Sequence, residues 1–152
     1  MDPLTISTSI ITLLQAASSI ISFCYDFKAA LNNAPWSLTQ IIDEMKCLRN
    51  ILESLESFAQ NEKRLPARLK TLPTFNLLSK PHSGPLDTCL KELTYVEKKI
   101  ISSTCIGTSG PRRRAILQSL GWQFNNKEIK ECIERIERCK TMLNLALTAG
   151  EA

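Results

Sequence analysis

Hydrophobic residues along this chain recur at alternating steps of three and four, the spacing that places them on one face of an α-helix. The pattern runs through four long segments, which begin near Pro3, Pro35, Pro85 and Asn126. Hydrophobic residues nowhere alternate with period two over a useful length, so a β-sheet is not predicted. We therefore expect an all-α fold: an antiparallel bundle of four long helices and one or two short ones, with the N-terminal helix central.

The first segment stands apart because residues 3–25 contain no charged side chain, whereas charged residues make up 22% of the chain. Asp2 is a favourable N-cap and Pro3 a favourable first helical residue, so we expect a helix that begins there. Its hydrophobic stripe comprises Ile6, Ile10, Leu13, Ala17, Ile20, Cys24, Phe27 and Leu31, widened by Ile11, Leu14 and Ile21. The opposite side carries uncharged polar residues: Thr5, Ser7, Thr8, Thr12, Gln15, Ser19 and Ser22.

An uncharged polar face allows this helix to exchange a protein environment for lipid. A helical Ser or Thr donates its hydroxyl to a carbonyl three or four residues earlier, so removing it from water costs far less than removing Lys or Glu. At about 1.5 Å per residue the segment is roughly 34 Å long, enough to cross a hydrocarbon layer of about 30 Å. About half of its positions are small, hydroxylic or amide, unlike a constitutive transmembrane helix.

We expect this helix to pack in the bundle at rest and treat a membrane-inserted state as a second hypothesis. The residues assigned to that state are Leu4, Ile6, Ile10, Ile11, Leu13, Leu14, Ala17, Ile20, Ile21 and Phe23. The start of the chain carries Asp2 rather than the basic region of a signal peptide, so a signal peptide is not expected.

The remaining segments supply helices that cover the first one. Residues 35–59 and 85–100 form amphipathic segments, whereas residues 61–85 contain several Pro and Gly and predict a long connection with room for one short helix. Another short helix precedes Trp122. Together these elements form one domain, residues 1–150, large enough to bury roughly 68–70% of its unfolded surface without a metal or disulfide.

Arg112, Arg113 and Arg114 open the short helix and form a basic patch. Three cations at a helix start oppose the helix macrodipole by roughly 0.3–1 kcal/mol each, so they do not serve local helix stability. Two interpretations remain open. One is a solvated basic turn; the other is a docking patch for phospholipid headgroups or an acidic partner, worth about 1 kcal/mol per residue near an anionic surface.

Three large aromatic residues, Trp36, Trp122 and Phe124, are expected to anchor the core. The last helix follows Phe124, and Asn125 or Asn126 provides its N-cap. The turn before that helix is therefore expected to place two of the anchors against the bundle.

Charged pairs line the outside of the last helix. Glu131 precedes Arg135 by four residues, and Glu134 precedes Arg138 by the same interval. Such pairs are worth only about 0.2–0.5 kcal/mol each, and we interpret them as a solvated face.

The six cysteines do not predict disulfides or a metal site. Five of them lie on or beside the hydrophobic stripes, where a free thiol behaves as a small hydrophobe: Cys24, Cys47, Cys89, Cys132 and Cys139. Without a secretion signal we expect reduced thiols in a cytoplasmic protein. The chain has one histidine, His82, and no closely spaced cysteine pair, so we expect no metal and no other cofactor.

Catalysis and nucleic-acid binding are not indicated. The net charge of +4 is modest, and the few aromatic residues are too scattered to form stacking platforms. Carboxylates lie on the predicted helix exteriors, and no Ser or Cys has a base at a recognisable motif spacing. We therefore expect neither an enzyme nor a nucleic-acid partner.

Several short stretches, in order along nearly the whole chain, resemble the N-terminal domain of fungal STAND proteins. They are Met1–Ser7, Ala34-Pro35-Trp36 before Ile41–Glu44, Leu48–Glu53, Gly84-Pro85-Leu86, and Trp122-Gln123-Phe124 through Lys127-Glu128 to Leu143–Leu147. The family consists of NOD-like receptors that carry a nucleotide-binding domain and ankyrin or other repeats. This chain has Gln123 where the family often has Pro, and it contains neither a P-loop nor a repeat array.

The resemblance implies a helical-bundle effector domain similar to the HeLo and HeLo-like domains of fungal programmed cell death and heterokaryon incompatibility. In those domains oligomerisation releases an N-terminal helix into membrane. The implied partners are further copies of the chain, anionic membrane lipids and other domains of a larger receptor. The implied location is cytoplasmic at rest and the plasma membrane on activation. An adaptor or oligomerisation module that contacts proteins and never enters lipid is the alternative.

Overall fold

The computed structural model describes residues 3–62, 84–101 and 110–151. It contains five helices and no strand within these residues: α1 (Pro3–Ala30), α2 (Trp36–Glu62), α4 (Pro85–Ile100), α5 (Gly110–Leu120) and α6 (Asn126–Glu151). The all-α prediction is confirmed, with four long helices and a short one before Trp122. Most of the expected connection, including its proposed short helix and His82, lies outside the described residues.

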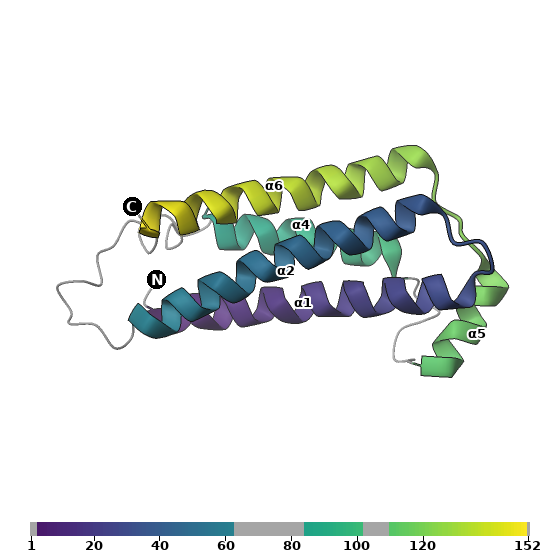
Figure 1. Ribbon diagram of the computed structural model, residues 1–152, viewed down its shortest axis with the longest axis horizontal. Helices are drawn as coiled ribbons and strands as arrows, with labels where there is room; N and C mark the ends of the chain where they lie inside the picture. Colours follow the sequence, from purple (N-terminus) through teal and green to yellow (C-terminus); the bar gives the residue numbers. More distant parts are fainter. Residues whose placement is uncertain (1–2, 63–83, 102–109, 152) are drawn as a thin grey trace.

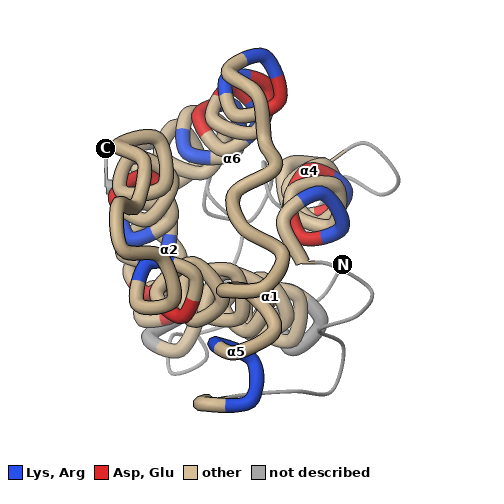
Figure 2. Tube along the Cα trace, turned by 90° about the vertical axis from the view of Figure 1, so that its right-hand side faces the viewer, with Lys and Arg blue, Asp and Glu red and all other residues tan. Residues whose placement is uncertain are grey.

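The four long helices form a ring in cross-section, in the order α1, α2, α6, α4 (Figure 2). α1 contacts α2, α4 and α5, more partners than any other described helix, which fits its expected central role. Of the described helices outside the ring, α5 lies against α1 at the end of α1 near Ala30 (Figure 1).

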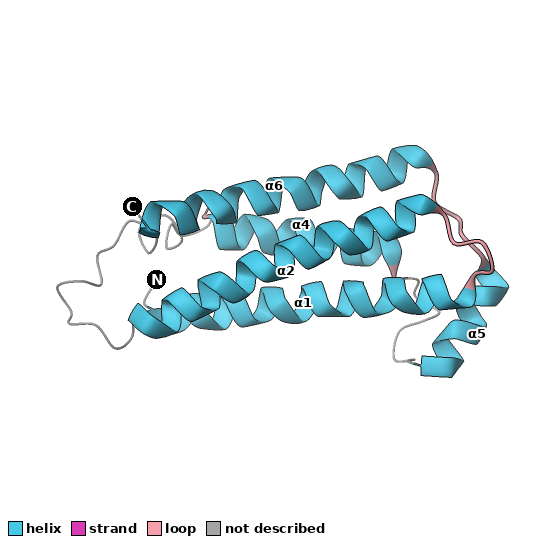
Figure 3. Cartoon of the chain, in the orientation of Figure 1, coloured by secondary structure: helices cyan, strands magenta, loops and turns pink. Residues whose placement is uncertain are grey.

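Long helices that follow one another along the chain run in opposite directions, as expected, but two pairs of ring neighbours run parallel (Figure 1). Residues 35–40 line a groove with residues 126–134, and residues 47–51 line the next groove with residues 140–148, so α2 and α6 share a direction. α1 and α4 likewise run in the same direction (Figure 1). Figure 3 shows the described loops at the ends of the helices.

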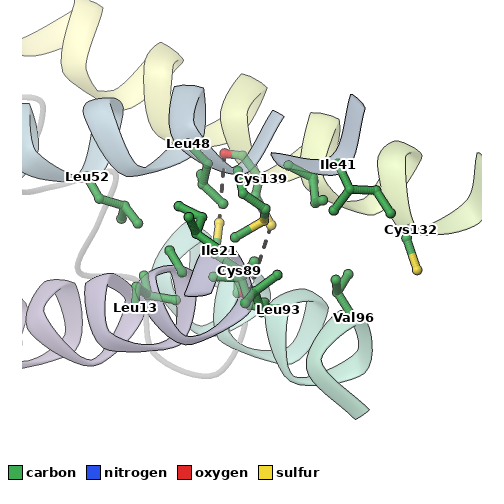
Figure 4. Close-up of a cluster of buried hydrophobic side chains, with 14 of the residues drawn as sticks. Leu13, Ile21, Ile41, Leu48, Leu52, Cys89, Leu93, Val96, Cys132 and Cys139 are labelled. Atoms are coloured by element: carbon green, nitrogen blue, oxygen red, sulfur yellow. Dashed lines mark hydrogen bonds between the residues drawn. The ribbon is translucent and has the colours of Figure 1, made fainter. Parts of the chain in front are cut away.

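One hydrophobic core runs through the bundle and is made by the stripes of all four long helices. Figure 4 shows its centre, where Leu13 and Ile21 of α1 face Leu48 of α2 and Leu93 of α4. Burying a side chain of this size contributes roughly 1.5–3 kcal/mol, so these stripes hold the bundle together.

Local capping fixes the turn that leads from α5 into α6. The Asn125 side chain accepts a hydrogen bond from the Glu128 backbone N–H at 2.8 Å and donates one to the Glu128 carboxylate at 3.0 Å, which confirms a predicted cap. Gly121 ends α5 with φ of 72°, a left-handed conformation that favours glycine. The chain therefore reverses between the two helices, which brings Trp122 back to α1.

Candidate functional site

α1 presents two faces of different chemistry. The inner face is buried as predicted and comprises Ile6, Ile10, Leu13, Ala17, Ile20, Ile21, Phe23, Cys24 and Phe27. The exposed positions up to residue 25 are all uncharged: Thr8, Ile11, Thr12, Gln15, Ser18, Ser19, Ser22 and Tyr25. By contrast, charged residues colour α2, α4 and α6 in Figure 2. We call this exposed set the uncharged face.

Most residues assigned to a membrane-inserted state belong to the core of the resting bundle. Ile11 is the exception, at 43% exposed, and Leu14 is half-buried. Leu4 lies in α1, but its side chain is outside the described residues. Because the other assigned side chains are buried, they can reach lipid only if α1 leaves the bundle.

Thr12 and Ser7 show two different environments for a hydroxyl group on α1. Thr12 donates its hydroxyl to the Thr8 carbonyl oxygen at 3.0 Å, the internal bond expected of a helical threonine. Ser7 is only 5% exposed, yet its hydroxyl has no hydrogen-bond partner among the described residues. An unpaired buried hydroxyl costs about 1–3 kcal/mol, so the resting bundle is not the optimal environment for this side chain.

A charged cluster ties α5 to the far end of α1. Asp26 is only 8% exposed, and Arg113 donates from Nε to its Oδ2 at 2.7 Å. Arg114 donates from Nε to Oδ1 at 3.3 Å, and a second nitrogen of Arg113 reaches the Ser22 hydroxyl at 3.1 Å. The Arg113 guanidinium also lies 5.4 Å from the centre of the Phe23 ring. We call Asp26, Arg113 and Arg114 the Asp26 clamp.

The three arginines, predicted as one patch that is either solvated or a docking site, have different environments in the structure. Arg113 is enclosed, with its side chain 12% exposed and paired to Asp26. Arg112 is exposed, and Arg114 is 52% exposed while also paired to Asp26. Arg113 pairs inward because the buried carboxylate needs a counter-ion, since an unpaired buried charge is costly.

Trp122 and Phe124 pack against the core, as predicted. The Trp122 ring meets Phe27 edge to face at 5.1 Å between centres and Phe124 at 4.9 Å. Phe27 in turn meets Phe23 at 5.8 Å. This aromatic chain joins the segment after α5 to the same turns of α1 that the clamp holds.

The expectation that Trp36 anchors the core is wrong, because its side chain is 74% exposed. Trp36 is the first residue of α2, at the end of the bundle, where no further turn of helix is present to cover it. It borders an open groove of about 620 Å³ between the first turns of α2 and α6, together with Ile129 and Ile133.

The charged pairs on α6 are not simply a solvated face. Arg135 does pair with Glu131 at 3.4 Å, but it also binds Glu92 of α4 at 2.9 Å and lies 3.7 Å from the centre of the Tyr95 ring. Arg138 pairs with Glu92 at 3.7 Å rather than with Glu134, its predicted partner on the same helix. A hydrogen bond from Tyr95 lowers the pKa of Glu131. These contacts connect α6 to α4.

Cysteines in the described residues are free thiols, and four of the five are buried. Cys89 and Cys139 each direct a thiol to the other's backbone carbonyl, at 3.8 and 3.9 Å (Figure 4). A side-chain hydrogen bond between the two thiols, together with burial, raises the pKa of Cys89. Burial raises the pKa of Cys24 to about 12. Cys47 is exposed, unlike the others, and no cluster suited to a metal ion occurs in the described part of the chain.

Sequence reasoning missed Asp26, Ser22 and Glu92. Asp26 offered one clue, because it is the first charged residue after the uncharged run. Its partner Arg113 is 87 residues away, and Glu92 is 43 residues from Arg135, so no helical spacing connects either pair.

By length and composition, one helix in the described residues is suited to crossing a membrane, over Ile6–Ala30. The core helix of a soluble protein meets the same criterion. In this helix, 44% of the 18-residue apolar window that meets it is buried. Comparison of the chain with protein-family models, characterised proteins and solved structures finds no match.

Proposed function

We propose that this chain is the N-terminal effector domain of a NOD-like receptor of the fungal STAND type, a bundle that acts in cell death. In this proposal the bundle rests in the cytoplasm, and oligomerisation of the receptor releases α1 into the plasma membrane. The observation that carries the proposal is the uncharged face of α1, because no ionised side chain from Pro3 to Tyr25 opposes transfer into lipid.

The free-energy balance favours a helix that can change environment. A charged side chain at the centre of a membrane helix costs about 2.5–3.5 kcal/mol on insertion scales, and α1 carries none over its first 23 helical residues. The internal bond of Thr12 shows how a hydroxyl on this face is satisfied without water. The Ser7 hydroxyl has no hydrogen-bond partner among the described residues, so moving it into lipid breaks no such bond.

An adaptor that binds proteins and never enters lipid is the second candidate. The exposed Trp36 and the groove beside it favour this function, because exposed aromatic residues next to a hydrophobic groove are common at protein interfaces. In that case the uncharged face of α1 serves as a helix-packing surface.

Leakage from anionic vesicles distinguishes the two functions. Substitutions at Ile10 or Ala17 are unsuitable because these residues are buried and a charge there unfolds the bundle. We instead place two lysines on the uncharged face, Gln15→Lys with Ser19→Lys. The matched control is Thr141→Lys with Asn144→Lys on the exposed face of α6.

The chain is fused to an inducible dimerisation module, and dye release is measured before and after dimerisation. Wild type and the α6 control are expected to release dye on dimerisation, whereas the α1 variant loses at least tenfold in rate with an unchanged melting temperature. Equal release by both variants contradicts insertion of α1. A dimerised wild type that releases no dye yet captures a partner through Trp36 supports the adaptor.

A further inference from the structure

The Asp26 clamp has the composition of an anion-binding site in which the Asp26 carboxylate is the bound anion. Both oxygens of the Asp26 carboxylate are bound by guanidinium groups, Oδ2 by Arg113 and Oδ1 by Arg114. Arginine is the residue best suited to bind carboxylate and phosphate oxygens through paired N–H groups. The carboxylate therefore occupies the position that a phosphate group would take.

The site is open on one side. Arg114 is about half exposed, and Arg112, two residues before it in the first turn of α5, is exposed. A phosphate on a membrane surface can approach these two arginines while Arg113 is still paired with Asp26. The exchange of partners can thus begin without prior unfolding.

α5 is attached to α1 by this cluster and by little hydrophobic burial of its own. Leu117 is the one buried residue of α5, and Ile116 only partly covers the core. The three arginines also oppose the macrodipole of their own short helix. An anion at the start of α5 other than Asp26 relieves the same repulsion, so the helix does not require Asp26 in particular.

Asp26 lies at the boundary of the uncharged run. Residues 3–25 are roughly 34 Å long as a helix, which matches a hydrocarbon layer of about 30 Å, and Asp26 follows immediately. If α1 spans the membrane, this carboxylate comes to lie among the headgroups, where the arginines meet phosphate.

We propose that Arg113 and Arg114 form a binding site for the phosphate of anionic phospholipids, which Asp26 fills at rest, so that membrane phosphate displaces the carboxylate and frees α1 from α5. The site thereby couples arrival at a membrane to release of the helix. This inference rests on the proposed function, because it names the lipid contact and the regulation of the same helix.

Two variants test the site on the intact chain with vesicles of phosphatidylcholine containing increasing phosphatidylserine. Asp26→Asn keeps the shape and one acceptor oxygen but removes the competing charge. We expect it to bind at about tenfold lower lipid concentration than wild type. Arg114→Gln removes one phosphate ligand at a half-exposed position and is expected to weaken binding about fivefold.

Arg138→Gln is the matched control, since Arg138 is 60% exposed and pairs with Glu92 at 3.7 Å, much as Arg114 pairs with Asp26. It is expected to bind vesicles like wild type, and melting temperatures verify that each variant is folded. The phosphate site is wrong if Asp26→Asn binds vesicles no better than wild type. It is also wrong if Arg114→Gln and Arg138→Gln weaken vesicle binding equally.

Alkylation of Cys132, a buried thiol of α6 that lies near Cys24 of α1 and loses this cover when α1 leaves, reports release and separates lipid from soluble phosphate. Anionic vesicles are expected to accelerate alkylation at least tenfold, whereas glycerol phosphate at the same phosphate concentration leaves it slow. Equal acceleration by glycerol phosphate overturns the membrane as the source. If Asp26→Asn binds vesicles tightly but no dimerised form releases dye, the phosphate site is supported and the proposed function is contradicted. Failure of the site and failure of the proposed function therefore give different results.

Discussion

α1 and α6 lie at opposite corners of the bundle and bury similar hydrophobic stripes, but their outer faces differ. The exposed side of α6 carries Glu134, Glu137 and Arg138, whereas the exposed side of α1 up to Tyr25 carries hydroxyls, an amide, an isoleucine and a phenol. In both helices the inner stripe supplies the buried hydrophobic side chains that form the core. The chemistry of the outer face of α1 is therefore not needed for folding and indicates a further role.

The two helices are also attached differently. α6 is tied to α4 along its middle by Arg135 and Glu92, in addition to its hydrophobic stripe. In the described residues of α1 the ion pairs begin at Asp26. Before Asp26, cations contact only uncharged side chains of this helix, as where Lys46 lies 4.9 Å from the centre of the Tyr25 ring. α1 is thus held by charge at one end only.

Thiol alkylation gives the largest expected difference. Burial raises the pKa of Cys24 to about 12 from 9.0, which slows alkylation at pH 8 on the order of a thousandfold through the smaller thiolate fraction. Burial also raises the pKa of Cys132 on α6. Mass spectrometry should find Cys47 labelled first and both buried thiols protected; faster labelling of Cys24 than of Cys132 at rest would show that α1 already opens alone.

Truncation of the core stripe tests whether both helices belong equally to the resting bundle. Leu13→Ala on α1 and Leu143→Ala on α6 each remove a fully buried side chain. We expect each to lower the free energy of unfolding by about 3 kcal/mol, measured by urea denaturation. A loss below about 1 kcal/mol for the α1 variant alone would mean that α1 is only loosely docked.

The ion pairs at α6 and α1 are compared by Arg135→Ala and Arg113→Ala. Each substitution leaves a largely buried carboxylate, Glu92 or Asp26, with one weaker partner. We expect a loss of about 2 kcal/mol in either case, from urea denaturation at low and high salt. If Arg113→Ala does not lower the free energy of unfolding, the Asp26 clamp does not hold α1.

The smallest effects are expected from the hydroxyls. Thr12 and Thr141 each donate to a carbonyl four residues earlier at 3.0 Å and are both exposed. Thr12→Val and Thr141→Val should change the free energy of unfolding by less than about 0.5 kcal/mol. Vesicle partitioning should rise for the α1 variant alone, and an equal rise in both would remove the distinction between the two faces.

Hydrophobic periodicity was sufficient to predict the helices and their buried stripes. Positions such as Ile10, Met45, Leu93 and Ile136 could be assigned to the core because each falls on a three-four repeat. The direction of ring neighbours could not be predicted, since α2 and α6 are separated along the chain and either orientation buries their stripes.

The candidate site was predicted only in part. The uncharged run of α1 is visible in the sequence, but the pairing of Arg113 with Asp26 depends on how α5 folds back after a break. The exposure of Trp36 could not be inferred because its hydrophobic surface suits a core equally well, and its position at the very start of α2 decides the outcome.

Both termini of the described chain, Pro3 of α1 and Glu151 of α6, lie at one end of the bundle, opposite α5 (Figure 1). A polypeptide fused after Glu151 therefore lies at the end of the bundle where α1 begins. The three arginines of α5 lie at the opposite end. An attached domain can therefore contact the first turn of α1 without contacting the Asp26 clamp. The point of attachment and the ion pairs that hold α1 are separated by the length of the bundle.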